Sequence, residues 1–283
     1  MSDALSQIFQ LMNSPPPPTA LKKISLSDCS IKSDASPGGD FPQFVQYITF
    51  LVKHPQYGEV ASLKAFRVDM TGIHNDHTSE RLFHWIFDEF SQETADISVA
   101  MFDRNGYVKD AFIKPGFRSG LGCWGQEMNE GELIYLKEVY VYPGFQGQGV
   151  GSRLLGELLS GSLVGLKSLV YCFPAPLRSG STREFYELQS KIVQFYLKHG
   201  FRRVGHTQYF AFAPNLSHPS RDIPADADAQ SVREIFPVDD TPLPLLEYAE
   251  HFPLHGAIRF LSEDKIAAFI DIYQTVDLSY LRS

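Results

Sequence analysis

The sequence predicts an α/β (α+β) fold, in which a mixed sheet is flanked by helices and followed by a helical C-terminal segment. Two β-rich runs, 46–52 and 60–68, are separated by a connection that contains proline and glycine, as adjacent strands are. A strand at 133–142 is followed by a glycine loop, a leucine-rich helix and a further strand at 168–173. Because such a crossover joins parallel strands, the sheet should contain both parallel and antiparallel pairs.

Composition and charge exclude several classes of protein. The 283 residues are 43% hydrophobic and 20% charged, which is ordinary for a soluble globular protein, and no apolar run approaches the ~18 residues of a membrane span. The first residues lack the basic region of a secretory signal, so we expect a cytoplasmic protein with no membrane partner. A net charge of -8 argues against nucleic-acid binding. Three widely spaced cysteines fit neither a disulfide framework nor a zinc site, and we expect free thiols.

The first half of the chain divides into an arm and the start of a domain. Residues 1–40 include four consecutive prolines and are expected to be mostly irregular. The main domain should extend over residues 41–214, with an amphipathic helix at 77–90. Asn105-Gly106 is typical of a type I′ turn and predicts a hairpin over 97–113. Residues 122–127 are expected to form a strand antiparallel to 133–142.

After the glycine loop, a short helix at 152–160 and a longer helix are predicted. The longer helix begins with a capping box, in which Ser181 and Glu184 satisfy each other's backbone donors, and it ends at Gly200. A single strand at 202–214 would complete the domain.

The last part of the chain changes composition. Residues 215–240 are rich in proline, serine, aspartate and alanine and are predicted to be a linker. Residues 241–283 are predicted to be helical. The segment 253–258 resembles the opening of an ankyrin repeat, and it fits equally well an ordinary helical hairpin packed on the main domain.

The glycine loop from Gln146 to Gly151 has the composition of a phosphate cradle. Glycines let the backbone approach a ligand, and the following helix offers unpaired N–H groups. A P-loop requires a lysine after the last glycine, where Ser152 and Arg153 stand instead. A dinucleotide fingerprint requires a glycine at position 152 and an acid after the second strand, and both are absent. ATP and NAD are therefore disfavoured.

The segment YLKEVYVYPGFQGQGVGSRLL, residues 135–155, is similar across its length to the acetyl-CoA motif of the GNAT acetyltransferase superfamily. FYLKHGFRRVG, residues 195–205, resembles the closing helix and strand of the same family. The resemblance covers residues 41–214 and implies a strongly twisted sheet whose two central parallel strands splay apart. It also implies acetyl-CoA as co-substrate, with the pantetheine arm between these strands.

The resemblance also implies the residues that contact the coenzyme. Backbone groups of strand 133–142 would bind the pantetheine arm, and the glycine loop would bind the pyrophosphate. The implied cofactor-binding residues are Val139, Tyr140, Val141, Gln146, Gly147, Gln148, Gly149, Val150, Gly151, Ser152, Arg153 and Gln189. The family usually has asparagine at the position of Gln189, so contacts from this helix should differ.

Two residues are candidates for the chemistry. Tyr196 matches the family tyrosine that protonates the departing thiolate, and its alternative is a core aromatic residue. Glu138 is the candidate base. Strand alternation places it on one face with Leu136 and Tyr140, whereas a bulge would change that phase. An exposed strand glutamate is the alternative, as is a water-relayed base such as Glu127 or Glu132.

Other reactive groups have less support. Cys172 could form an acyl-enzyme, although a small core residue is the favoured interpretation. His74, His77, His84 and Asp76 have no spacing typical of a metal site, so we expect capping or surface roles and no metal.

The sequence therefore predicts an N-acetyltransferase that transfers acetyl from acetyl-CoA to an amine by direct attack in a ternary complex. The acceptor would be a small-molecule amine or a lysine-bearing substrate. The alternative is a non-catalytic protein that binds coenzyme A and recognises a protein partner through the ankyrin-like C-terminal segment.

Overall fold

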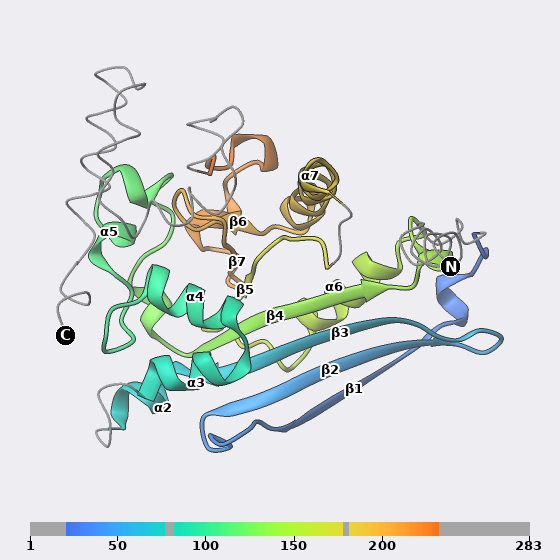
Figure 1. The fold of residues 1–283 in the computed structure, drawn as a ribbon, viewed down its shortest axis with the longest axis horizontal. Coiled ribbons are helices and arrows are strands. Elements are labelled where there is room, and N and C mark those ends of the chain that lie inside the picture. The colour runs from blue at the N-terminus through green and yellow to red at the C-terminus, as the bar shows by residue number, and fades with distance from the viewer. Residues whose placement is uncertain (1–20, 77–81, 178–180, 232–283) are drawn as a thin grey trace, which may run out of the picture.

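The computed structural model describes residues 21–76, 82–177 and 181–231 (Figure 1). A seven-stranded sheet of order β1-β2-β3-β4-β5-β7-β6 organises this part of the chain. The strands are β1 Ser30–Pro37, β2 Val45–His54, β3 Gly58–Asp69, β4 Glu132–Val141, β5 Leu169–Cys172, β6 Arg202–Arg203 and β7 Phe210–Phe212. The helices are α2 Met70–Asn75, α3 Leu82–Phe90, α4 Gln92–Met101, α5 Asp110–Ile113, α6 Val150–Ser160 and α7 Thr182–Lys198.

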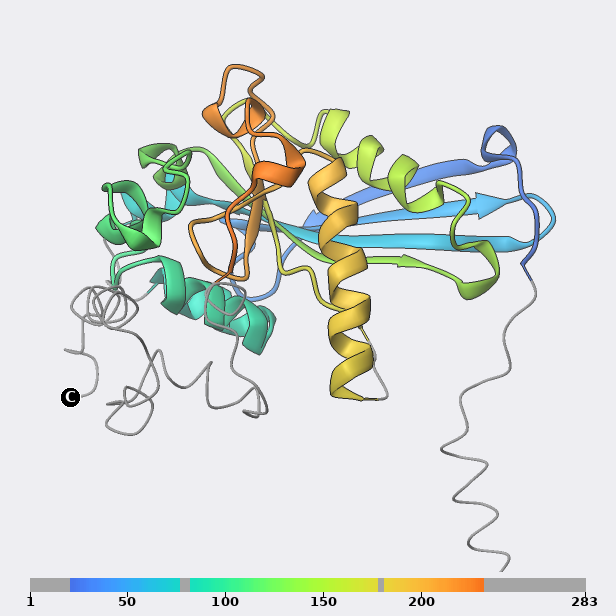
Figure 2. The same ribbon diagram turned by 90° about the horizontal axis from the view of Figure 1, so that it is seen from above.

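The mixed sheet predicted from the sequence is confirmed. β4 and β5 are parallel and are joined through α6, while the other neighbouring strands are antiparallel. Helices cover both faces, with α3 and α4 on one side and α6 on the other, as the view from above shows (Figure 2). α7 starts where it was predicted to start, since the Ser181 hydroxyl accepts a hydrogen bond from the Glu184 N–H.

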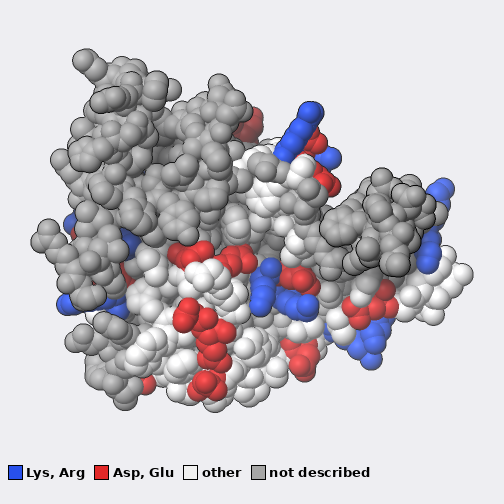
Figure 3. Space-filling view, in the orientation of Figure 1, with Lys and Arg blue, Asp and Glu red and all other residues white. Residues whose placement is uncertain are grey.

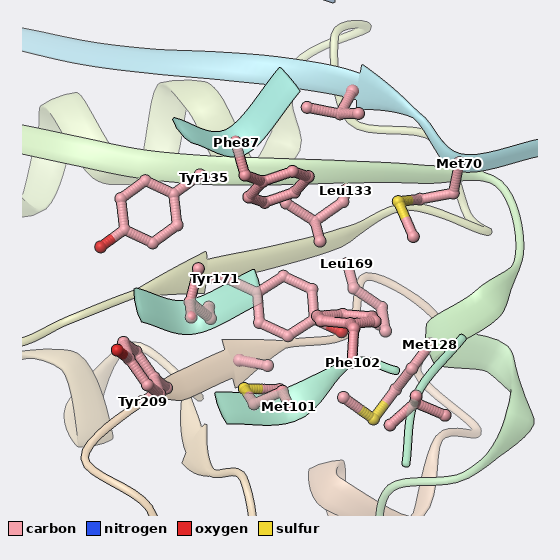
Figure 4. Close-up of a cluster of buried hydrophobic side chains, with 14 of the residues drawn as sticks. Met70, Phe87, Met101, Phe102, Met128, Leu133, Tyr135, Leu169, Tyr171 and Tyr209 are labelled. Carbon is pink, nitrogen blue, oxygen red and sulfur yellow. The ribbon is translucent and has the colours of Figure 1, made fainter. Parts of the chain in front are cut away.

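Each face of the sheet carries its own hydrophobic core. The core under α2, α3 and α4 combines strand residues such as Phe66 and Tyr135 with helix residues such as Phe87 (Figure 4). The core under α6 and α7 contains Leu154 and Tyr196 together with the opposite side chains of β2 to β5. A strand with both faces buried must be apolar on both, which explains why β5 consists of four buried residues, LVYC.

The hairpin predicted over 97–113 is wrong. Residues 92–101 form α4, whose first turn is capped by the Ser91 hydroxyl accepting from the Thr94 N–H. The Asn105-Gly106 turn does form, but it closes only one bridge, between Phe102 and Val108. The packing of Ile97 and Met101 into the core therefore outweighed the preference of the β-branched and turn residues in this stretch for a hairpin.

Three other local predictions differ from the structure. Residues 126–129 form a 3-10 turn rather than the strand expected at 122–127. The single strand expected at 202–214 is a hairpin of β6 and β7. The N-terminal arm is not irregular throughout, because β1 pairs along β2 at the edge of the sheet. β1 can be polar because none of its residues is buried on either face of the sheet, which removes the hydrophobic signal.

Residues 215–231, within the predicted linker, pack on the domain. The Arg202 guanidinium donates to the Ile223 carbonyl at 2.7 Å, and the Arg203 N–H donates to the Asp228 carboxylate at 3.0 Å. The rest of the predicted linker and segment 241–283, predicted to be helical and ankyrin-like, lie outside the described residues. The domain boundaries therefore stay predictions.

Gly131 and Gly58 form a matched pair for testing the start of β4. Both have positive φ, +66° and +72°. A Cβ at Gly131 would lie 2.6 Å from the Lys167 carbonyl oxygen, whereas nothing lies within 4 Å of one at Gly58. We expect Gly58→Ala to lower the free energy of unfolding by about 1 kcal/mol from backbone strain alone. Gly131→Ala should cost about 3 kcal/mol, because overpacking adds to the strain. Urea unfolding measures both, and equal losses would contradict this account.

Candidate functional site

The two central parallel strands separate part-way along their length. β4 and β5 pair at four positions, from Leu133 with Leu169 to Leu136 with Cys172. β5 ends at Cys172, whereas β4 continues to Val141 with β3 alone as its partner. Backbone N–H and C=O groups on the β5 side of Val139 to Val141 therefore face an opening in the sheet, and a ligand with amide groups can pair with them as a further strand would.

A β-bulge in β4 decides which side chains face each way. Lys64 of β3 is opposite Glu138, and Ala65 is opposite Leu136, so Lys137 is the extra residue. Lys137 and Glu138 consequently both lie on the face that α3 and α4 cover, while Val139 returns to the α6 face with Leu136. The alternation predicted from the sequence, with Glu138 and Leu136 on one face, is wrong for this reason.

The predicted base, Glu138, is held by a lysine of the neighbouring strand. Its carboxylate lies 3.0 Å from the Lys64 ammonium, and the two side chains are 25% and 56% exposed. The other predicted carboxylates also have partners. Glu127 accepts from the Gly125 N–H and lies 3.2 Å from His218, and Glu132 lies 3.3 Å from Arg67.

The glycine loop connects the open end of β4 to α6. Gly149 is the N-cap of α6 in a left-handed conformation, with φ 81°, which a glycine adopts without strain. The first N–H groups of the helix have no partners within it, so they are free to meet an anion. Gly151 lies in a narrow gap, since a Cβ there would be 3.4 Å from Val141 and 3.8 Å from Phe195 of α7. The amide of Gln146 donates to the Val141 carbonyl and closes the loop on β4.

Residues 22–26, the N-terminal strap, bind the outer side of this loop. Both ends of the Gln148 amide contact the strap, accepting from the Ile24 N–H and donating to the Lys22 carbonyl. The Arg153 guanidinium donates to the Leu26 carbonyl. Gln148 and Arg153 thus hold the strap in this structure, and their predicted contacts with a pyrophosphate stay predictions.

Tyr196 lies on the α6 and α7 side of the strand separation. It is 7% exposed and packs edge-on against Phe201. Burial raises the pKa of its hydroxyl well above the ordinary value, and Cys172 and Glu93 add to the rise. The phenol therefore stays protonated and can act as a proton donor. Gln189 lies seven residues earlier on α7 and is half-buried.

Cys172, at the end of β5, behaves as a core residue. It is fully buried, and burial raises the pKa of its thiol, with a further contribution from the Glu93 charge. Because a thiolate is the nucleophilic form, this environment disfavours an acyl-enzyme and supports the interpretation as a small core residue.

Glu93 is the carboxyl group that sequence reasoning missed. It lies in the first turn of α4 and accepts a hydrogen bond from the hydroxyl of Tyr135 in β4. Tyr135 and Tyr209 point their hydroxyls toward the same side, away from Leu133 (Figure 4). Burial raises the pKa of Glu93, whereas the Tyr135 hydrogen bond and the Lys137 charge lower it. The N-cap signal of Ser91, followed by an acid in the first turn, could have revealed the helix that places this residue.

The histidines predicted to have capping or surface roles make local contacts. His74 stacks on Tyr107 at 4.1 Å and hydrogen-bonds to the Gly106 carbonyl. His84 hydrogen-bonds to Ser98 and to the Asp103 carbonyl. His77 lies outside the described residues. Within the described ranges, no group of three histidine, cysteine, aspartate or glutamate side chains is arranged to hold a metal ion.

Glu93 should make stability depend on pH in a definite direction. Its folded pKa is raised, so the neutral form is favoured in the folded state, and that contribution is present at low pH and lost as the pH rises through the folded pKa. We therefore expect Glu93→Gln to raise the melting temperature more at pH 8 than at pH 4. The exposed Glu157 of α6 serves as the control, and Glu157→Gln should show no such difference. A benefit of Glu93→Gln that grows on acidification would contradict this sign.

Comparison with known proteins agrees with this geometry. A family model described as "Acetyltransferase (GNAT) domain" matches residues 94–203, from α4 to β6. No curated protein and no solved structure gives a match. No helix within the described ranges has the length and hydropathy needed to cross a membrane. The matched residues include the separated parallel strands, the glycine loop and α7, and this part of the chain is therefore similar to the GNAT acetyltransferase domain.

Proposed function

We propose that the protein is an acetyl-CoA-dependent N-acetyltransferase, in which the amine of the acceptor attacks the thioester directly in a ternary complex. One observation carries the proposal: the open edge of β4 leads straight into the glycine loop, and the buried hydroxyl-bearing Tyr196 packs in the core beside that edge. The match to an acetyltransferase domain supports acetyltransferase chemistry in general, and the roles of the individual residues are proposals.

The described residues fit the coenzyme in two respects. The backbone of Val139, Tyr140 and Val141 has no strand beside it where β5 has ended, which suits the amides of the pantetheine arm, although the Val141 carbonyl already accepts from the Gln146 side chain. The start of α6 suits the pyrophosphate, because Gly147 to Ser152 form a glycine-rich helix N-terminus. Val150 is buried and anchors the helix, so its contribution would come from the backbone. Gln189 would contact the coenzyme from α7.

Tyr196 would supply the proton that the departing thiolate requires. Its raised pKa keeps the phenol protonated at neutral pH, and burial excludes water as a competing donor. A protonated amine must also lose a proton before it can attack. Glu138 is the base that the sequence favours, and its ion pair with Lys64 counts against this role because the carboxylate is already engaged.

The acceptor class follows from the same chemistry. A small-molecule amine or a lysine side chain would enter from the face of the sheet that α3 and α4 partly cover, opposite Tyr196. No metal is required for this reaction, because the thioester is already an activated acyl donor. A protein partner for the C-terminal segment stays a prediction.

Tyr196→Phe tests the acid. Removing the hydroxyl should lower kcat about 100-fold, since general acid catalysis contributes on that scale. The KM for acetyl-CoA should change little, because the ring and its packing remain. Thiol release from acetyl-CoA with a panel of amines measures both constants. Wild-type protein that binds the coenzyme and acetylates none of these acceptors would overturn the proposed function.

Gly151→Val tests the coenzyme site, with Gly156→Val of the same helix as its matched control. A side chain at Gly151 would enter the gap between Val141 and Phe195, whereas nothing lies within 4 Å of a Cβ at Gly156. Valine has a somewhat higher helix propensity than glycine, so neither substitution should lower stability through the helix backbone itself. Only Gly151→Val should weaken coenzyme A binding, by about tenfold or more in calorimetry. Equal affinities would place the coenzyme elsewhere.

A further inference from the structure

A pocket of about 230 Å³ lies on the α3 face of the sheet, beside the bulge in β4. Aromatic rings form much of its wall, from Tyr47, Phe66 and Phe90, and Thr49 adds a hydroxyl. Two lysines, Lys64 and Lys137, complete the lining together with Ile48 and Ala65. No carboxylate belongs to the lining among the described residues.

The two lysines differ in their charge environment. Lys64 is paired with Glu138, so its charge is compensated. The Lys137 ammonium donates to the Phe90 carbonyl at 3.5 Å and forms no ion pair within the described residues, although its charge also lowers the pKa of Glu93. A small group of basic side chains lies among acidic ones near the middle of this face of the molecule (Figure 3). The pocket therefore favours an anionic group.

A line of aromatic rings connects the pocket to Glu93. Phe90 stacks on Phe66 with ring centres 4.3 Å apart, and Phe66 stacks on Tyr135 at 5.3 Å. The Tyr135 hydroxyl donates to the Glu93 carboxylate, and Glu93 follows Phe90 by three residues. Tyr135 is also the residue before Leu136, where β4 and β5 make their last pair. An acid and a cationic pocket thus lie next to each other at the strand separation.

We propose that the acceptor is a primary amine that also carries an anionic group, with its amine at Glu93 and its anion at Lys137. Glu93 is then the base, in place of Glu138, and Tyr135 positions it. This inference rests on the proposed function, and it adds the substrate class and the acceptor-binding residues. A free amino acid is the simplest compound with both groups.

The proton and bond balance is complete with these residues. The Glu93 carboxylate takes one proton from the acceptor ammonium, and the neutral nitrogen attacks the thioester carbonyl carbon. The C–N bond forms and the C–S bond breaks, with the bonding pair leaving on sulfur. Tyr196 protonates the sulfur, and the second proton lost by nitrogen replaces the proton that Tyr196 gave. The products are an amide, a thiol and one proton on Glu93, which passes to water.

Matched acceptors test the anion site. Free amino acids and their C-terminal amides share the amine and differ in the carboxylate, and we expect wild-type kcat/KM to favour the acids about tenfold or more. Lys137→Met should raise KM for the acids about tenfold and leave the amides unchanged, and Lys137→Arg should retain the preference. Lys53→Met, an exposed lysine of β2 outside the pocket, is the control. Calorimetry with protein saturated with coenzyme A should show the same loss of amino-acid affinity without turnover.

Two carboxamide variants test the base. Glu93→Gln should lower kcat about 100-fold or more, and Glu138→Gln should leave it within about threefold. Three results would overturn the inference while leaving amine acetylation in place. They are a larger loss of kcat from Glu138→Gln than from Glu93→Gln, a preference of the wild-type protein for the amides, and an equal effect of Lys137→Met on both acceptors. Absence of acetyl transfer to every acceptor would instead overturn the proposed function, and the inference with it. Melting temperatures of all variants exclude misfolding as the cause.

Discussion

The separation of β4 from β5 after the Leu136 and Cys172 pair is the constraint on which the rest of the site depends. Backbone amides inside a domain need partners, and leaving one unpaired costs free energy comparable to a lost hydrogen bond. β4 nevertheless runs on to Val141 beside an opening rather than a strand. A ligand that presents amides along that edge would complete the sheet, which is why we propose the pantetheine arm as its occupant and the glycine loop as the site of the pyrophosphate.

The bulge at Lys137 has a second effect, because it turns two consecutive side chains toward the same face. Without it, Lys137 and Glu138 would lie on opposite faces, and Glu138 would be directed with Leu136 into the apolar core under α6. With it, Lys137 reaches the C-terminal end of α3, and Val139 and Val141 keep the core under α6 apolar. One extra residue in β4 therefore leaves apolar side chains on the α6 face and charged side chains on the α3 face, the two faces that we propose for the coenzyme and the acceptor.

The titrating groups of the site approach from opposite faces of the sheet. Tyr196 belongs to the core under α6 and α7, whereas Glu93 reaches the strands through Tyr135 on the α4 side. Burial acts on both pKa values in the same direction, which keeps the phenol protonated and makes the carboxylate a stronger base. In the proposed mechanism, burial thus favours proton donation by Tyr196 on one side and proton removal by Glu93 on the other.

The sequence alone determined the parts of this protein whose signals are local. The β-rich runs, the glycine loop, the leucine face of α6 and the Ser181 N-cap of α7 each depend on residues within a few positions of one another, and all form as expected. The family resemblance, which rests on residues 135–155 and 195–205, agrees with the domain found by comparison. Tyr196 and the loop residues could be named for the same reason, although their roles stay predictions.

Tertiary structure decided what depends on distant partners. β1 is a polar edge strand that forms because β2 supplies its hydrogen bonds, and α4 is a helix because its apolar residues meet the sheet. Glu138 lies on the opposite face from the one predicted by strand alternation, because the bulge at Lys137 shifts the register of β4 against β3. Glu93 became a candidate only when Tyr135, 42 residues away, brought it to the strand separation. Whether a carboxylate can act as a base depends on the charges, hydrogen bonds and burial around it, and these are set only when the chain has folded.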